Sequence, residues 1–394
     1  GPHGRRLDPR DLNSFTVEFG GADQVFHIGP ASVAVPGMIA GLGEASRRLG
    51  RLPMSGLVEA GVTAARRGVV LTRQVAFLHT ILGGMLTLTP EAAAIYAPEG
   101  RLLGQGERVR NPELAETLLH LAEAGPDTLR DGELAGLIVD HLAATGGLVT
   151  ADDLRSYRVI DREPVHVTYR DVDVLTNPPP SSGGALIAAA LRVLEASEPA
   201  RDDVEHYLGV TRAGWAANAL RTRDFATSLH EEDCLNRMWA RLDQGGDGGG
   251  PADRKPAGST THISAVDAEG GVASLSGSNG SGSGVVVPGT GMLLNNMLGE
   301  EDLNPGGFGL LEPGRRMTSM MSPTLLLRGG EPLAALGAAG SNRLRSAILQ
   351  TIVGVVDGGL DLRDAVYRPR VHPEGNGVDV EGGVPEECVA ALEA

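Results

Sequence analysis

The sequence predicts an α/β (α+β) fold. Three observations support this fold class: helical and strand-type segments alternate along the chain, a β-hairpin pattern begins at Thr260, and 41% of the 394 residues are hydrophobic. Periodicity of apolar residues distinguishes the two kinds of segment. A chain of this length and composition can bury a substantial core, as one large domain or as two smaller ones.

The first part of the chain contains several helix starts. Residues 35–42 are mostly small and apolar and can open a helix. Asn111 before Pro112 places a preferred N-cap ahead of a proline at the first helical position. The sequence Thr150-Ala151-Asp152-Asp153 is a capping-box pattern, which predicts another helix. Residues 165–169 and 172–175 follow as two strands, rich in β-branched residues.

A rigid turn and a low-complexity arm occupy the middle of the chain. Residues 177–184 contain three consecutive prolines and lead into the apolar helix 185–191. Between Asp243 and Gly258 the composition falls to mostly Gly, Asp and Pro, which is typical of a flexible linker that cannot bury itself. We expect the chain to be divided in this arm.

The arm ends at Ser259, and Thr260 begins the predicted hairpin. Polar and apolar residues alternate from Thr260, residues 267–271 supply turn chemistry, and residues 272–276 alternate again as the second strand. Cleavage before Thr260 would place a free α-amine, whose reference pKa is about 7.7–8.0, beside the Thr260 hydroxyl. Nucleophile and general base would then belong to one residue.

Three glycine-rich or small-residue segments follow the hairpin. Residues 277–284 are a glycine and serine loop that leads into the strand 285–287, and residues 317–324 precede an apolar strand. Residues 337–342 precede a helix that begins at Arg343. A small-residue turn at a helix N-terminus presents backbone N–H groups, which suit an anion or a developing oxyanion.

Composition excludes several classes of partner. The formal net charge of −16 argues against nucleic acid or an anionic membrane surface, because both attract clustered basic residues. No segment approaches the roughly 20 consecutive apolar residues of a membrane-spanning helix. Residues 1–6 lack the apolar core of a signal peptide, and the sequence does not assign a compartment.

Metal, disulfide and cofactor chemistry have little support in the sequence. Cys234 and Cys388 are too few and too far apart for a metal or disulfide framework, and we interpret both as incidental. The ten histidines form no metal-binding motif. We therefore expect neither a metal nor a cofactor.

Other nucleophile and nucleotide motifs are missing from the sequence. The single lysine, Lys255, follows Ala252 where a Ser-x-x-Lys motif needs serine. No Gly-x-Ser-x-Gly elbow, P-loop or dinucleotide fingerprint occurs in a convincing context.

Five motifs together carry a resemblance to a known family. They are Pro178-Pro179-Pro180-Ser181-Ser182-Gly183-Gly184, Thr260-Thr261-His262-x-Ser264, Leu294-Asn295-Asn296-Met297, Ser319-Met320-Met321-Ser322-Pro323-Thr324 and Ala365-x-x-x-Pro369-Arg370. In these motifs and in their order, most of the chain resembles the γ-glutamyltranspeptidases, which are N-terminal-nucleophile hydrolases.

The resemblance implies a four-layer αββα sandwich, made as an inactive precursor. Self-cleavage between Ser259 and Thr260 would give a large-subunit region, residues 1–259, and a small-subunit region, residues 260–394, which associate in one shared domain. Thr260 would attack an amide carbonyl, and its own α-amine would act as the base. Water or an amine acceptor would then resolve the acyl-enzyme.

The resemblance also assigns roles to individual residues. Ser276 or Ser278 would hydrogen-bond the nucleophile, and Ala339 and Gly340 fall where a glycine pair forms the oxyanion hole. Thr318 and Ser319 fall where a serine pair binds the substrate's α-carboxylate. Asn279 lies near the family's substrate-binding asparagine.

Two departures bear on substrate. The family has an Asp pair that binds the substrate's α-amine, whereas this chain has Glu300 and Glu301. The family's N-terminal portion, with its carboxylate-binding arginine, has no counterpart before Gly1, so we expect the large-subunit region to be incomplete at its N-terminus. The C-terminal strands of the family have no counterpart after Ala394.

Three hypotheses follow. The first is a γ-glutamyl amide hydrolase or acyltransferase. The second is a paralogue with the same threonine chemistry and a different acyl group, such as an acylase or a biosynthetic enzyme. The third is a non-catalytic scaffold. A small subunit that begins at Thr260 would separate the enzymes from the scaffold.

Overall fold

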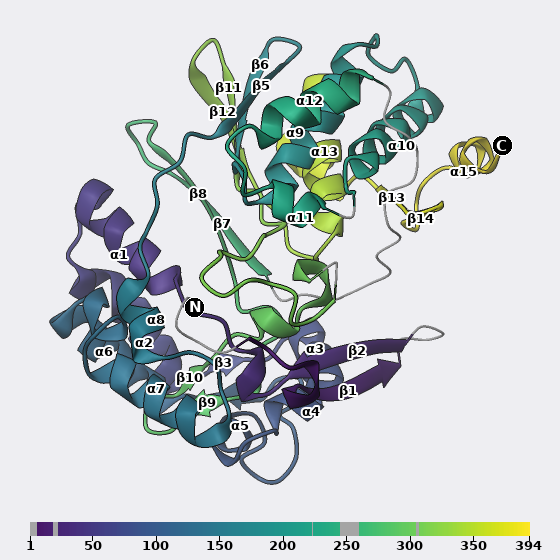
Figure 1. The fold of residues 1–394 in the computed structure, drawn as a ribbon. Helices are drawn as coiled ribbons and strands as arrows, with labels where there is room; N and C mark the ends of the chain where they lie inside the picture. The colour runs from purple at the N-terminus through teal and green to yellow at the C-terminus, as the bar shows by residue number, and fades with distance from the viewer. Residues whose placement is uncertain (1–5, 19–22, 223, 245–259, 305–306) are drawn as a thin grey trace. The chain divides into compact units, whose positions relative to one another are not determined.

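The structure is a computed structural model that describes residues 6–18, 23–222, 224–244, 260–304 and 307–394. Two compact units emerge from the contacts within the chain (Figure 1). Unit 1 comprises residues 1–161 and 279–315, and unit 2 comprises residues 162–278 and 316–394. Residues 245–258 of the predicted arm, and Ser259, lie outside the described residues. Asp243, which we assigned to the arm, is the last residue of a helix.

Unit 2 contains a four-stranded antiparallel sheet with the order β12-β11-β6-β5. The strands are β5 (Val165–Tyr169), β6 (Val172–Thr176), β11 (Thr324–Arg328) and β12 (Glu331–Leu336). The central pair joins distant segments, since Leu326 of β11 lies opposite Val174 of β6. The sheet therefore combines residues from both sides of the predicted cleavage site.

Seven helices and two hairpins are described in unit 2 besides this sheet. The helices are α9 (Ser182–Glu195), α10 (Asp203–Ala219), α11 (Phe225–Ser228), α12 (Cys234–Asp243), α13 (Arg343–Val356), α14 (Leu362–Tyr367) and α15 (Glu386–Glu393). The hairpins pair β7 (Thr260–Val266) with β8 (Val272–Ser278), and β13 (Val371–Glu374) with β14 (Gly377–Val380).

Helix α9 is the centre of the unit 2 core. Its residues 182–191 are all buried, in agreement with the apolar helix predicted there. It packs on β5 and β6 and also contacts α10 and α13. Complete burial explains why the helix is apolar around most of its circumference rather than along one stripe.

Unit 1 contains eight described helices and three two-stranded pairings. The helices are α1 (Met38–Leu49), α2 (Met54–Arg67), α3 (Arg73–Ile81), α4 (Gly83–Leu86), α5 (Pro90–Tyr96), α6 (Pro112–Ala124), α7 (Glu133–Thr145) and α8 (Ala151–Ser156). The strand pairs are β1 (Asn13–Glu18) with β2 (Asp23–Ile28), β3 (Val69–Val70) with β4 (Arg108–Val109), and β9 (Val286–Val287) with β10 (Met292–Leu293).

Local capping signals in unit 1 match the sequence predictions. The Asn111 side chain accepts a hydrogen bond from the Leu114 N–H at the start of α6. Thr150 and Asp153 form a reciprocal capping box at the start of α8. Both interactions lie within one helical turn, which is why sequence alone could predict them.

The core of unit 1 also crosses the predicted cleavage site. Ile138 and Leu142 of α7 share a buried cluster with Val285, Val287 and Leu294. Each compact unit therefore depends on segments from both predicted subunits, and cleavage before Thr260 would leave both cores composed of two chains.

Candidate active site

Thr260 is the first residue of β7 and lies opposite Ser278 of β8. The Thr260 hydroxyl donates a hydrogen bond to the Ser278 hydroxyl, with 3.4 Å between Oγ1 and Oγ. Ser276 lies two residues earlier and contacts the His262 ring instead, at 2.9 Å from Oγ to Nδ1. Of the two serines that the sequence left as alternatives, Ser278 is thus the one that contacts Thr260.

The polar face of this hairpin faces the protein. Ser264 donates a hydrogen bond to the Ala335 carbonyl, and Ser274 donates one to the Leu336 carbonyl, both in β12. The apolar side chains of the other face are exposed, with Ile263 at 57% and Leu275 at 43%. The alternation predicted from the sequence is present, but its polar side is the one that packs.

His262 lies at the centre of the polar face, and sequence reasoning assigned it no role. Its Nε2 lies 2.9 Å from the Ser264 hydroxyl, and burial lowers its pKa, so the ring is neutral near pH 7. A Cβ on Gly337 would lie 2.0 Å from Nδ1, so the ring packs where only glycine leaves room. In the sequence, the spacing of His262 could have indicated its place. It is two residues from Thr260 and two from Ser264, and alternate residues of a strand lie on the same face.

These contacts give the direction in which β12 runs relative to the hairpin. Ser264 contacts Ala335, and His262 lies against Gly337, so β12 runs antiparallel to β7. If the same antiparallel direction continues for two residues, Ala339, two residues after Gly337, approaches Thr260, which is two residues before His262. Because the loop follows β12 directly, the chain itself carries the predicted oxyanion residues towards the Thr260 end of the hairpin.

The backbone of this loop has donors available. Within the part of the chain that the structure describes, the N–H groups of Ala339 and Gly340 donate no hydrogen bond. Gly340 has φ +120° and Ser341 has φ +54°. A serine in this left-handed region is uncommon and carries backbone strain. The loop thus exposes unpaired N–H groups in a conformation that its surroundings must maintain.

The predicted carboxylate-binding segment is anchored by the proline-rich turn. The Ser319 carbonyl accepts hydrogen bonds from the backbone N–H of Ser182 at 2.8 Å and from the hydroxyl of Ser181 at 3.0 Å. A Cβ on Gly183 would lie 2.1 Å from the Met320 carbonyl oxygen, so this position requires glycine. The turn that the sequence showed as rigid therefore positions Thr318 and Ser319.

Asn279 and Glu300 belong to unit 1, whereas the other predicted site residues that are described belong to unit 2. Asn279 is exposed, and its side-chain amide donates to the Leu293 carbonyl. Glu300 is 8% exposed and accepts hydrogen bonds from the Ser281 backbone N–H at 2.7 Å and from its hydroxyl at 3.0 Å. Burial raises the pKa of Glu300.

Two further structural findings concern metal and membrane. Among the described residues, no group of three or more His, Cys, Asp or Glu side chains is arranged to hold a metal ion. Cys234 and Cys388 are both free and buried. None of the described helices combines the length and the apolar character needed to span a membrane.

Comparison with known proteins identifies the family. The family model described as Gamma-glutamyltranspeptidase matches residues 5–394. The chain belongs to the γ-glutamyltranspeptidase family. It is an enzyme of this amide hydrolase and transferase class, as the motifs of the sequence predicted.

Two curated relatives and one solved structure illustrate the family's range. The chain is 34% identical to an acylase ACY 1 proenzyme from Pseudomonas sp., over 93% of this chain and 68% of the relative. It is 29% identical to a glutathione hydrolase proenzyme from Escherichia coli, over 91% of this chain and 68% of the relative. A cephalosporin acylase from Bacillus halodurans matches 100% of this chain and 80% of its own, with a TM-score of 0.77 and 24% identity. This likeness confirms the predicted N-terminal-nucleophile hydrolase fold.

Proposed function

We propose that this γ-glutamyltranspeptidase-like enzyme is a self-processing precursor that cleaves between Ser259 and Thr260 and then uses Thr260 as its nucleophile. The observation that carries the proposal is the position of Thr260, at the first residue of β7 with its hydroxyl bonded to Ser278. The proenzyme names of the two curated relatives support processing of this kind.

In the mature enzyme the freed α-amine of Thr260 removes the hydroxyl proton as Oγ1 attacks the amide carbonyl. A C–O bond forms, and the carbonyl oxygen becomes an oxyanion. The unpaired N–H groups of Ala339 and Gly340 are suited to donate to that oxygen. Collapse of the intermediate breaks the C–N bond, and the departing amine takes the proton.

Water or an acceptor amine then attacks the Thr260 ester by the same route. It gives a proton to the α-amine as its oxygen or nitrogen bonds to the acyl carbon. The C–Oγ1 bond then breaks, and the α-ammonium returns a proton to Oγ1. In this mechanism Ser278 orients Oγ1 of Thr260 directly. Ser276 contacts His262 and so influences Thr260 only indirectly. The proton is carried by groups of Thr260 itself in both halves of the reaction.

One observation concerns the acyl group and favours a donor other than a γ-glutamyl amide. By the resemblance, Glu300 falls where the family binds the substrate's α-amine. Its Oε1 accepts both hydrogen bonds from Ser281, and burial raises the pKa of this carboxyl, which disfavours the anion that an ammonium needs. A buried ammonium without an available anion is costly. The second candidate is therefore an acylase-type enzyme with the same Thr260 chemistry.

Two measurements test the proposal. Intact mass spectrometry should find a fragment that begins at Thr260, and an electrophilic acyl substrate should label the Thr260 hydroxyl. A protein that stays full-length after long incubation and takes no label would contradict both the processing and the catalytic role.

A further inference from the structure

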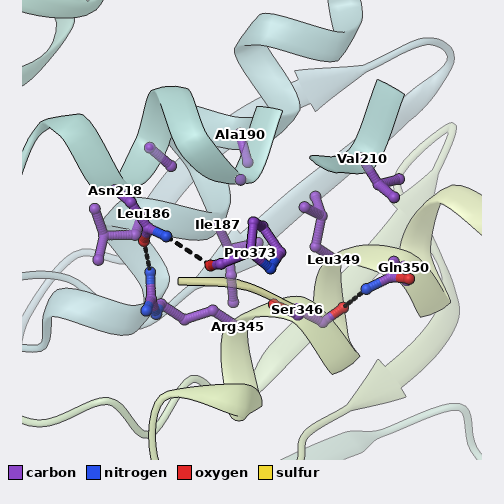
Figure 2. A pocket seen from close by; sticks show the side chains of 12 residues that line it. Leu186, Ile187, Ala190, Val210, Asn218, Arg345, Ser346, Leu349, Gln350 and Pro373 are labelled. Carbon is purple, nitrogen blue, oxygen red and sulfur yellow. Dashed lines mark hydrogen bonds between the residues drawn. The ribbon is translucent and has the colours of Figure 1, made fainter. Parts of the chain in front are cut away.

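A buried ionic cluster involves the first turn of α13, the helix that follows the predicted oxyanion loop in the chain. Glu374 of β13 pairs with Arg221 at 2.6 Å and with Arg345 of α13 at 3.1 Å. The side chains of Glu374, Arg221 and Arg345 are only 12%, 5% and 8% exposed. Arg345 also donates to the Asn218 side-chain oxygen, as Figure 2 shows.

A second contact holds the same turn. The Ser346 hydroxyl lies 2.7 Å from Nδ1 of His372, which belongs to β13 like Glu374. Burial and the nearby arginines lower the pKa of His372 to about 4, so the imidazole is neutral near pH 7. Helix α13 is thereby fixed to β13 by two adjacent side chains, Arg345 and Ser346.

The cluster is not a substrate pocket. The cavity that Arg345, Ser346 and Asn218 help to line has a volume of about 20 Å³, and most of its other lining residues are apolar (Figure 2). A space of this size admits about one water molecule. Since this cavity is too small for a substrate, the two arginines and the glutamate serve another role. Burying these charged groups is costly, and that role must offset the cost.

The loop that precedes α13 is not held by its own polar side chains. Asn342 occupies the N-cap position of α13 but makes no capping hydrogen bond, and among the described residues its amide and the Ser341 hydroxyl are buried without partners. Ser341 also has φ +54°. A loop with a strained residue and unpaired polar groups persists only where its surroundings hold it in place.

We propose that Arg345, held by Glu374 and Asn218, is a positioning residue that fixes the 337–342 loop and thus the oxyanion donors relative to Thr260. The contact between His262 and Gly337 holds the start of the loop. The ionic cluster holds its end through Arg345, three residues after Asn342. Arg345 acts through the backbone of the loop and touches no reacting group. This inference rests on the proposed function for its catalytic consequence.

The test compares Arg345→Met with Arg343→Met. Arg343 lies in the same turn but is exposed and pairs with Asp379 on the surface, so it controls for loss of an arginine near the loop. For Arg345→Met we expect kcat per titrated active site to fall tenfold or more, with KM changed less than threefold. Arg343→Met should keep both constants within twofold of the wild-type values.

The pattern of rates distinguishes positioning from a general structural role. Acylation and deacylation pass through the same kind of oxyanion, so stopped-flow measurements should find both slowed to a similar extent in Arg345→Met. Arg345→Lys, which restores the charge without the planar fork, should recover part of kcat. Equal kcat values per active site in Arg345→Met and wild type would overturn the proposal, even if the variant is less stable.

A readout that does not depend on activity separates this inference from the proposed function. Amide hydrogen exchange of the Thr260→Ala protein should show faster exchange at Arg343 and Leu344, whose N–H groups donate to the Gly340 and Ser341 carbonyls of the loop, when Arg345→Met is added. Arg343→Met should cause no such change. Unchanged exchange at these two amides would overturn the positioning role. A wild-type protein without acyl transfer activity would instead refute the proposed function and leave the exchange result standing.

Discussion

Thr260 and Ser278 face each other across the first pair of the β7–β8 hairpin, with 3.4 Å between their hydroxyl oxygens. The pairing places the predicted nucleophile at the very start of a strand whose polar side packs on β12. Cleavage of the preceding bond would leave the hydroxyl in this position, since the hairpin register fixes it from the other strand.

The first prediction concerns maturation. Thr260→Ala should remain uncleaved and inactive, because both attacks need the hydroxyl. Thr260→Ser should keep part of each activity, since only the β-methyl group that restrains χ1 is lost. Intact-mass analysis over several days measures cleavage. Normal cleavage of Thr260→Ala would show that another residue attacks the Ser259 carbonyl.

The second prediction separates the two serines of β8. Ser278→Ala removes the hydroxyl that bonds Thr260, and a net hydrogen bond is worth about 1 kcal/mol, so kcat should fall roughly fivefold. Ser276→Ala removes a contact of His262 and should lower kcat less than Ser278→Ala. Steady-state kinetics of matured protein, normalised to active sites, decides the order. The reverse order would assign the orienting role to Ser276.

The third prediction concerns acyl specificity. We expect poor turnover of γ-glutamyl-p-nitroanilide relative to an anilide that lacks the α-amine, because burial raises the pKa of Glu300 and its Oε1 already accepts two hydrogen bonds from Ser281. Glu300→Gln should change the ratio of the two kcat/KM values by less than about threefold, or 0.7 kcal/mol. Efficient γ-glutamyl turnover that collapses in Glu300→Gln would restore the standard γ-glutamyl activity.

The fourth prediction is that the two products of cleavage stay together. Strand β11 lies between β6 and β12, and Leu326 is fully buried in the shared sheet. The fragments should elute as one species in size-exclusion chromatography and separate only in denaturant. Leu326→Ala should lower the free energy of unfolding by about 2–5 kcal/mol. Fragments that separate in native buffer would contradict the shared sheet.

The fifth prediction is a loss of stability in acid. Burial holds the pKa of His206 and of His372 at about 4 in the folded protein, below the ordinary value of 6.5. The unfolded chain therefore binds these protons first as the pH falls, and stability present above pH 6.5 is lost between pH 6.5 and 4. Each histidine should contribute about 2–3 kcal/mol to the difference between pH 7 and pH 4.5.

Urea unfolding of the uncleaved Thr260→Ala protein at the two pH values measures this loss. His206→Leu should reduce the difference between the two unfolding free energies. The exposed His166, changed to Gln, serves as the control. An equal difference in the His206→Leu protein would show that acid acts on other groups.

Local signals in the sequence determined much of this protein. The caps at Asn111 and Thr150, the apolar helix 185–191 and the hairpin that starts at Thr260 could all be predicted, because each depends on residues close together in the chain. The five motifs also sufficed to predict the family and its fold, since each motif is a short run of residues and their order along the chain is fixed.

Only the tertiary structure decided which of these residues act together. It distinguished Ser278 from Ser276 through the hairpin register, turned the polar face of the hairpin towards β12, and tied Glu300 to Ser281. Arg345 and Glu374 form an ion pair although they lie 29 residues apart in the sequence, and neither belongs to a recognised motif. Such pairings depend on distant segments packing against one another, and the burial that makes them matter is created only when the chain folds.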